Sequence, residues 1–260
     1  GWVTSIVQTA AASQKRINEF LSKKNDIFSE KSSKKNILGD ISFQNVSFKY
    51  KKGDVLKQIN FDIKKGEFLG LIGHVGSGKS TLLELICRFI NPKKGNIYLD
   101  QEPIENFDIN HLRSFISFVP QESFLFSDTI RNNLLFANKN ASEEELINIM
   151  DTVCMTHDIS KFEFGLDTYI GERGVTLSGG QKQRLNIARA LLKKSNILLI
   201  DDSLSSIDVE NENKILSNIY SFKGKKTTLI VSNRISAISK CDQIIVLNNG
   251  SIIEKGNHVD

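Results

Sequence analysis

A glycine-rich segment at residues 73–80 constrains the fold of this 260-residue chain more than any other feature of its sequence. The segment reads Gly-His-Val-Gly-Ser-Gly-Lys-Ser and fits the pattern G-x-x-x-x-G-K-S/T. An apolar run at residues 68–72 precedes it, as in a strand buried on both faces, and a helical pattern follows from Ser80 to Phe89. A strand, a glycine turn and a helix in this order predict a loop whose backbone N–H groups surround a phosphate.

The side chains of this loop have the chemistry that binding a nucleoside triphosphate requires. Lys79 is expected to reach the β and γ phosphates, and Ser80 to ligate Mg²⁺. His74 stands at a free position of the pattern, where a surface role is a simpler interpretation than a catalytic one. A chance glycine-rich turn is the alternative, and the flanking strand and helix argue against it. The residues of this segment that we expect to contact the nucleotide are Gly73, His74, Val75, Gly76, Ser77, Gly78, Lys79, Ser80 and Thr81.

A second strand pattern supplies a carboxylate for the same site. Residues 197–200 are continuously apolar and end at Asp201, which we expect to hold the shell of the Mg²⁺ ion. An apolar run that ends in aspartate is a weak signal by itself. Combined with the phosphate loop, it becomes a strong one.

Residues 177–181 form a second candidate anion site. They read Leu-Ser-Gly-Gly-Gln and stand just ahead of a helical pattern at residues 185–192. Ser178 fits the N-cap of that helix, and the glycines expose its first N–H groups. One chain therefore carries two helix N-termini suited to phosphate.

Composition places the chain among globular proteins with a substantial core. Hydrophobic residues make up 40% and charged residues 25% of the sequence, and no run of 18 apolar residues occurs. The net charge of +4 is mild and does not argue for nucleic acid as a partner. The beginning of the chain does not resemble a secretory signal. Cys87, Cys154 and Cys241 are widely spaced, which suits a reducing compartment and disfavours a zinc or disulfide framework.

The first part of the chain divides into a helix, a linker and strands. Apolar residues recur at helical spacing over residues 1–21, and a polar stretch without a period continues to residue 36. Neighbouring strand patterns at residues 41–50 and 55–63, with a turn at 51–54 between them, predict a small antiparallel sheet.

The remainder alternates between strands and helices, with one interruption. Residues 127–167 carry helical signals alone, including a capping box of Ser142 and Glu145, and we interpret them as an inserted helical subdomain. Alternation elsewhere predicts a parallel sheet covered by helices. Its further buried strands are expected at residues 116–119, 197–200, 228–231 and 244–247.

These motifs together resemble the nucleotide-binding domain of ATP-binding cassette (ABC) transporters, over about residues 37–257, and residues 177–181 match that family's highly specific signature motif. The resemblance implies an α/β fold of the P-loop NTPase class. Its core is a mostly parallel sheet, joined by an antiparallel β subdomain and an inserted helical subdomain at about residues 122–180. The domain would occupy residues 37–260. Residues 1–36 would be the helix and linker that follow a last transmembrane helix, in a longer membrane protein from which this chain is a piece.

The family's binding residues can be transferred to matching positions of this sequence. Tyr50 looks like the aromatic residue that stacks on adenine, although an ordinary strand aromatic is the alternative, and Val55 is expected beside it. Gln121 looks like the residue that touches Mg²⁺ and the attacking water, and Asp208 lies in what looks like the loop that meets a partner domain. In this family, ATP is enclosed between the phosphate loop of one domain and the signature of another. This arrangement accounts for the second anion site at residues 177–181.

Two positions depart from the family pattern. Active members carry glutamate after the Mg²⁺ aspartate, where this chain has Asp202, and histidine in the switch loop, where it has Asn233. The Asp202 carboxylate would stand about 1.5 Å further from the attacking water, because its side chain is one methylene shorter. A shift of about 1 Å can cost about 100-fold in rate, and a positioned base contributes roughly 10²–10⁴-fold. Asn233 can donate a hydrogen bond but cannot carry positive charge. We therefore expect Asp202, Gln121 and Asn233 to support slow hydrolysis, while ATP binding persists.

The resemblance favours the exporter branch of the family. Residues 168–174 look like the exporter loop that contacts membrane helices, and the N-terminal helix looks like the tail of the last membrane helix. The expected partners are a transmembrane domain of the same transporter and a second nucleotide-binding domain, the latter a different chain with intact glutamate and histidine. This soluble piece would then lie at the cytoplasmic face of the cell membrane.

Three other functions remain open from the sequence. A slow homodimeric ATPase would use Asp202 as a weak base. An ATP-binding regulatory module would hydrolyse nothing. A nucleic-acid or chromosome-associated clamp would need a second cassette or a long coiled coil, and this sequence shows neither. The transported compound cannot be read from this chain.

Overall fold

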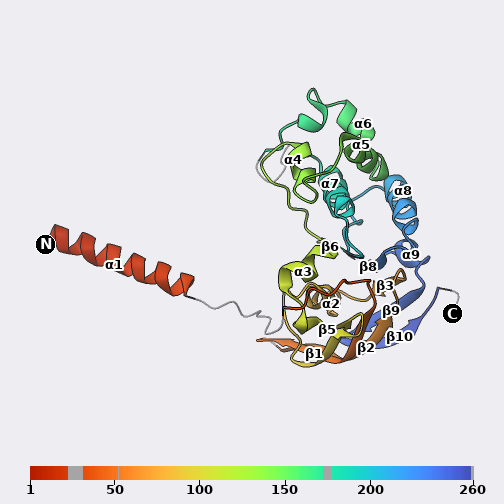
Figure 1. The fold of residues 1–260 in the computed structure, drawn as a ribbon, viewed down its shortest axis with the longest axis horizontal. Coiled ribbons are helices and arrows are strands. Elements are labelled where there is room, and N and C mark those ends of the chain that lie inside the picture. The colour runs from red at the N-terminus through yellow and green to blue at the C-terminus, as the bar shows by residue number, and fades with distance from the viewer. Residues whose placement is uncertain (23–31, 52, 172–176, 259–260) are drawn as a thin grey trace.

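Two β-sheets form the centre of the computed structural model, which describes residues 1–22, 32–51, 53–171 and 177–258 (Figure 1). The first sheet is antiparallel, in the order β2-β1-β4-β5. Its strands are β1 (Ile41–Tyr50), β2 (Gly53–Ile63), β4 (Lys94–Leu99) and β5 (Glu102–Pro103). The second sheet has the order β10-β9-β3-β8-β7-β6, and only β10 runs antiparallel to its neighbour within it. Its strands are β3 (Phe68–Ile72), β6 (Ile116–Val119), β7 (Ile197–Asp201), β8 (Thr227–Val231), β9 (Gln243–Asn248) and β10 (Ser251–Gly256). The predicted division into antiparallel and mainly parallel sheets is confirmed.

Strand β7 is continuously apolar from Ile197 to Ile200 because both faces of its sheet are covered. In β7, Ile197 and Leu199 belong to one core cluster, and Leu198 and Ile200 belong to the other. All four side chains are fully buried. Successive side chains of a strand point to opposite faces, so a strand between two cores needs this continuous apolar run.

Helix α2 (Lys79–Ile86) lies between the two sheets. Its Leu82 and Leu83 pack in one cluster with Phe43 of β1 and Leu71 of β3. The helix ends three residues before the predicted end at Phe89, because Arg88 takes a left-handed backbone with φ of 47°. A 3₁₀ turn (Ile104–Asn106) and α3 (Ile109–Ser114) complete this layer.

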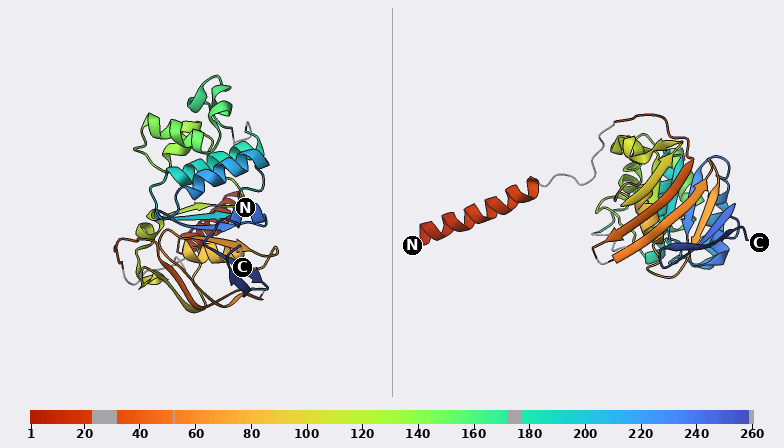
Figure 2. Two further views of the ribbon diagram at one scale, coloured as in Figure 1. Left: turned by 90° about the vertical axis from the view of Figure 1, so that its right-hand side faces the viewer. Right: turned by 90° about the horizontal axis from the view of Figure 1, so that it is seen from below.

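Helices cover the opposite face of the parallel sheet (Figures 1 and 2). Three of them contribute apolar side chains to the core cluster that contains Leu198 and Ile200. These helices are α7 (Gly179–Leu192), α8 (Val209–Tyr220) and α9 (Ile235–Ile238). Helices α4 (Ile130–Leu135), α5 (Glu143–Thr152) and α6 (Thr156–Ser160) follow β6 in the chain, as the predicted helical insert requires. Both α4 and α5 pack on α7.

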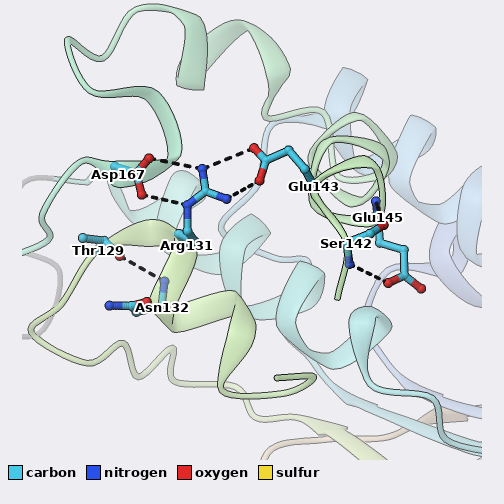
Figure 3. Close-up of polar contacts among 7 residues, drawn as sticks. All are labelled: Thr129, Arg131, Asn132, Ser142, Glu143, Glu145 and Asp167. Atoms are coloured by element: carbon cyan, nitrogen blue, oxygen red, sulfur yellow. Dashed lines mark hydrogen bonds and ion pairs between the residues drawn. The ribbon is translucent and has the colours of Figure 1, made fainter. Parts of the chain in front are cut away.

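Side-chain caps and ion pairs define the helical insert (Figure 3). Ser142 and Glu145 form the predicted capping box of α5. Thr129 caps α4 by accepting a hydrogen bond from the Asn132 N–H at 3.0 Å. Arg131 of α4 pairs with Glu143 of α5 and with Asp167 at the end of a 3₁₀ turn (Gly165–Asp167). One guanidinium therefore joins three segments of the insert.

The N-terminal helix α1 (Trp2–Leu21) forms as predicted, and none of its residues is buried. It stands clear of the sheets in Figure 1 and in the right-hand view of Figure 2. Within the described ranges, no helix combines the length and the apolar character needed to cross a membrane. After α1, the described residues include Ser33, which forms a β-bridge with Phe107 of the main body.

A half-buried lysine immediately before β8 should make folding stability depend on pH. Burial lowers the pKa of Lys226 to about 8, and the Lys193 ammonium acts in the same sense. Its Nζ donates to Ser195 Oγ at 3.3 Å. Between pH 8 and the ordinary pKa of 10.5, the unfolded chain binds more protons than the folded chain, so the free energy of unfolding should rise with pH.

We therefore expect Lys226→Met to raise the free energy of unfolding at pH 7 by about 1 to 3 kcal/mol. The variant should also flatten the dependence on pH between 8 and 10. Urea unfolding at pH 7 and pH 9.5 measures both effects. The exposed neighbour Lys225, changed to Met, serves as the control and should shift neither value. A loss of stability at pH 7 in Lys226→Met would contradict this account.

Candidate functional site

A pocket of about 330 Å³ opens where the carboxyl ends of β3, β7 and β8 meet the loop after β6. Ends of neighbouring parallel strands at one sheet edge form the usual ligand crevice of α/β folds. The pocket gathers most of the residues that the sequence predicts for nucleotide, metal and catalysis. It is lined by Tyr50, Val55, Val75, Gly76, Gly78, Lys79, Ser80, Thr81, Gln121, Asp201, Asp202, Val231 and Asn233.

The turn from β3 to α2 requires glycine at two positions. A Cβ at Gly73 would stand 2.1 Å from the carbonyl oxygen of Leu247 on β9. Gly78 caps α2 with φ of 105°, and a Cβ there would meet Leu56 at 2.6 Å. A side chain fits neither place, so the backbone itself borders the pocket and its N–H groups are available to a ligand.

Lys79 lies inside the turn and is bonded to it. Its Nζ donates to the carbonyl oxygens of Gly73 at 2.5 Å and His74 at 3.0 Å. Burial lowers the pKa of Lys79, while the carboxylates of Asp202 and Asp201 act in the opposite direction. Ser77 Oγ is buried and has no hydrogen-bond partner among the described residues. This turn therefore combines a cation and an unmatched hydroxyl with amides, as a bound polyphosphate requires.

Asp201 and Ser80 form the candidate metal site. Asp201 is 6% exposed, and burial raises the pKa of its carboxyl group, while a hydrogen bond from Ser80 opposes the shift. Within the described residues, no three His, Cys, Asp or Glu side chains group to hold a metal by themselves. The donors that reach the pocket are hydroxyl, amide and carboxylate oxygens, which suit Mg²⁺ when phosphate oxygens complete the shell. Ser80, Asp201 and Gln121 would hold such an ion, which would neutralise charge on the phosphates.

Asp202 follows Asp201 with an unusual backbone. Its φ is 43°, in the left-handed region, and its N–H donates to the Val231 carbonyl oxygen at 3.0 Å. Burial raises the pKa of Asp202, and the positive charges of Lys79 and Arg234 oppose this. Asp202 lines the same pocket as Asn233, which lies in the turn after the neighbouring strand β8. Strained backbone at such a position is a feature of functional sites.

Tyr50 lies at the end of β1 and is held by a carboxylate that sequence reasoning missed. The Tyr50 hydroxyl donates to Glu84 Oε2 at 2.8 Å, and its ring meets Phe48 edge to face at 4.8 Å between centroids. Glu84 follows Ser80 by four residues on α2, a helical spacing that could have identified it. Tyr50 as a residue remains 45% exposed, which leaves it available for stacking.

Three predicted loop residues, Gly73, His74 and Ser77, do not line this pocket. Gly73 and His74 instead border a neighbouring, mainly apolar pocket that also contacts Val75 and Asn233. Val231, which lines the main pocket, was not predicted as a site residue. It ends a strand beside β7, and that pairing is the signal that was overlooked.

The predicted second anion site is an exposed helix N-terminus. Ser178 caps α7, and Gln181 completes a capping box with it. Gln181 Nε2 donates to Asp158 Oδ1 at 2.8 Å, and Arg184 pairs with the other oxygen of Asp158 at 2.9 Å. Ser178 and Gly179 are exposed. The tip is thus rigidly held from α6 and open to solvent.

The phosphate-loop pocket is not lined by any residue of this tip, which comprises Leu177, Ser178, Gly179, Gly180 and Gln181. The tip lies instead beside the loop at residues 203–208, because a Cβ at Gly180 would stand 3.3 Å from the Ser206 carbonyl oxygen. Asp208 ends this loop by capping α8, where it accepts a hydrogen bond from the Asn211 N–H at 3.0 Å. Of the expected exporter loop, residues 172–174 lie outside the described residues.

Comparisons with known proteins give one consistent family. A family model described as ABC transporter matches residues 56–205. "Uncharacterized ABC transporter ATP-binding protein YfiB" of Bacillus subtilis (strain 168) is 42% identical over 255 residues, covering 97% of this chain and 44% of the relative. "ATP-dependent lipid A-core flippase" of Pasteurella multocida (strain Pm70) is 41% identical over 226 residues, covering 86% of this chain and 39% of the relative.

A solved structure has the same fold. The structure of a bacterial Atm1-family ABC exporter with ATP bound superposes with a TM-score of 0.91 at 32% sequence identity, covering 98% of this chain and 45% of that one. The chain spans less than half the length of the two relatives described above.

Lys79 is expected to serve nucleotide binding and Asp202 to serve hydrolysis, and two substitutions test this division. Lys79→Ala should weaken ATP binding by more than about 100-fold, because it removes the ammonium from the phosphate turn. Asp202→Asn keeps the shape of the side chain and should leave the Kd for ATP within about threefold. Equilibrium titration with ATP and Mg²⁺ gives both values. An equal loss of affinity in the two variants would contradict this division of roles.

Proposed function

The chain belongs to the ABC transporter family as one of its ATP-binding domains, and we propose that it is the motor domain of an exporter. Such a domain binds ATP and, in this family, hydrolyses it. The observation that carries the proposal is the exposed α7 tip, a second anion site that takes no part in the chain's own pocket. The free N–H groups of this helix N-terminus could bind the phosphate of a nucleotide that is held by another domain.

Two such domains meeting head to tail would enclose ATP between the phosphate loop of one and residues 177–181 of the other. Tyr50 would stack on adenine beside Val55, and Lys79 would contact the phosphates. Gln121 would orient the attacking water with Asp202 as base, and Asn233 would donate to the terminal phosphate. Asp208 would lie at the contact between domains.

We further propose that this chain's own site binds ATP but hydrolyses it slowly. The support is that Asp202 and Asn233 line one pocket, which therefore combines a shortened carboxylate with a neutral amide. The intact tip of α7 would complete a competent site with a partner chain that carries glutamate and histidine. A slow homodimer and a regulatory module without turnover are the alternatives.

A transmembrane partner is proposed from a second surface feature. A pocket of about 300 Å³ opens beside Phe89, Phe118 and Phe136, with Arg113 and Arg189 at its border. Phe136 is 67% exposed, although phenylalanine is among the residues most often buried. The name "ATP-binding/permease protein" of a relative 38% identical to this chain supports a membrane part. The domain would then act at the cytoplasmic face of the membrane.

Restoring the family residues tests the slow site. Asp202→Glu with Asn233→His should raise ATP turnover of the chain by roughly 10- to 100-fold, because the carboxylate then reaches the water and a histidine faces the phosphate. A phosphate-release assay at saturating ATP measures it. Rapid turnover by the unchanged chain would refute the slow-site proposal.

Charge at the α7 tip tests the sandwich. Gly179→Asp places a carboxylate at the anion site and should abolish ATP-dependent self-association while the Kd for ATP stays unchanged. Light scattering with and without ATP reports the association. Gly179→Ala is the matched control, because a Cβ there meets no atom within 4 Å, and its association should fall much less. Association that survives Gly179→Asp would exclude this tip from the interface.

A further inference from the structure

Arg234 joins three segments around the nucleotide pocket. It follows Asn233 in the turn after β8, and its own N–H donates to Ser232 Oγ at 3.0 Å. Its guanidinium pairs with the Glu212 carboxylate of α8 through Nη1 and donates to the Ser205 carbonyl oxygen at 3.1 Å through Nη2. The fork of one arginine thus connects the turn after β8 with the loop at residues 203–208 and with α8.

The partner carboxylate is one that the protein could not bury without a cation. Glu212 is 2% exposed, and its Oε1 has no hydrogen-bond partner among the described residues. A buried carboxylate is unfavourable unless it is paired. Arg234 supplies the positive charge of this pair, and that interaction holds the guanidinium in one place.

Both ends of this connection reach sites with a proposed role. On one side, Asn233 and Asp202 line the nucleotide pocket, and the Asp202 N–H is bonded to the last residue of β8. On the other side, Ser206 follows Ser205 and lies beside Gly180 at the α7 tip, 3.3 Å from where a Cβ of that glycine would stand. A displacement of the turn after β8 would therefore act on the loop that lies against the second anion site.

We propose that Arg234, held by Glu212, is the positioning residue that sets Asn233 toward the terminal phosphate and couples this turn to residues 203–208. The inference rests on the proposed ATP site, because the terminal phosphate is what Asn233 would detect. ADP lacks that phosphate and leaves the turn without its contact. The pair should therefore matter for ATP and little for ADP.

Affinity for the two nucleotides separates this role from a merely structural one. We expect Arg234→Met and Glu212→Gln each to weaken ATP binding by about 10-fold and ADP binding by less than about twofold. Equilibrium titration of the chain with each nucleotide and Mg²⁺ gives the ratio. Glu210→Gln is the matched control, because it breaks the exposed pair with Lys214 on the same helix and should leave both affinities unchanged.

An equal loss of ATP and ADP affinity in both variants would overturn the inference, as would no loss in either. Arg234→Lys guards against a folding defect, since it keeps the charge beside Glu212 but cannot span both contacts. It should still lose ATP affinity selectively, by about threefold, and an unchanged ATP-to-ADP ratio in this variant overturns the proposal.

Hydrogen exchange gives a second measurement. ATP should protect residues 203–208 more than ADP does in the unchanged chain, and this difference should vanish in Arg234→Met. A difference that persists would overturn the coupling. A failure of the proposed ATP site would be distinguished by a separate result, since Lys79→Ala would then leave ATP binding intact.

Discussion

The close approach of β3, α2 and β9 is the constraint on which the nucleotide pocket depends. The carbonyl oxygen of Leu247 lies where a side chain at Gly73 would begin, so that the turn must be bare backbone. Such proximity is possible because α2 is held between two sheets by leucine and phenylalanine side chains of one cluster. The packing thereby places Lys79 and Ser80 at the first turn of a helix, facing the strand end that carries Asp201. Stability of the core and chemistry of the pocket are consequences of the same contacts.

The pocket brings together three ionisable side chains whose charged forms are disfavoured by burial. The shifts in pKa of Asp201, Asp202 and Lys79 all have burial as their largest cause, and each favours the neutral form. A protein optimised for stability alone would avoid such an arrangement. Phosphate and Mg²⁺ would supply the opposite charges that these groups lack. The free energy of binding can therefore offset the folding stability that is lost by burying them. Perturbed groups in a pocket are for this reason a physical indication of function.

Local patterns were sufficient for the parts of the fold whose signals lie close together in the chain. The phosphate turn, the buried parallel strands, the Ser142 capping box and the Ser178 cap were all predicted from neighbouring residues. The sequence reasoning did not assign β4, β10 or α8, and it extended α2 to Phe89, because the left-handed Arg88 carries no local signal. Glu84, Asp158 and the pair of Arg234 with Glu212 were missed for a different reason. Their partners come from other elements, and only the folded chain brings them together. The roles assigned to Tyr50, Gln121, Asn233 and Asp208 remain predictions.

The capping box of α7 determines how quickly the exposed tip could engage a ligand. Ser178 Oγ and Gln181 Oε1 are each already accepting a backbone hydrogen bond, and Asp158 fixes the amide orientation of Gln181. An arriving phosphate would meet donors that need no rearrangement, and no internal bond would have to break first. Association at this tip would then be paced by collision and long-range attraction, with little activation barrier of its own.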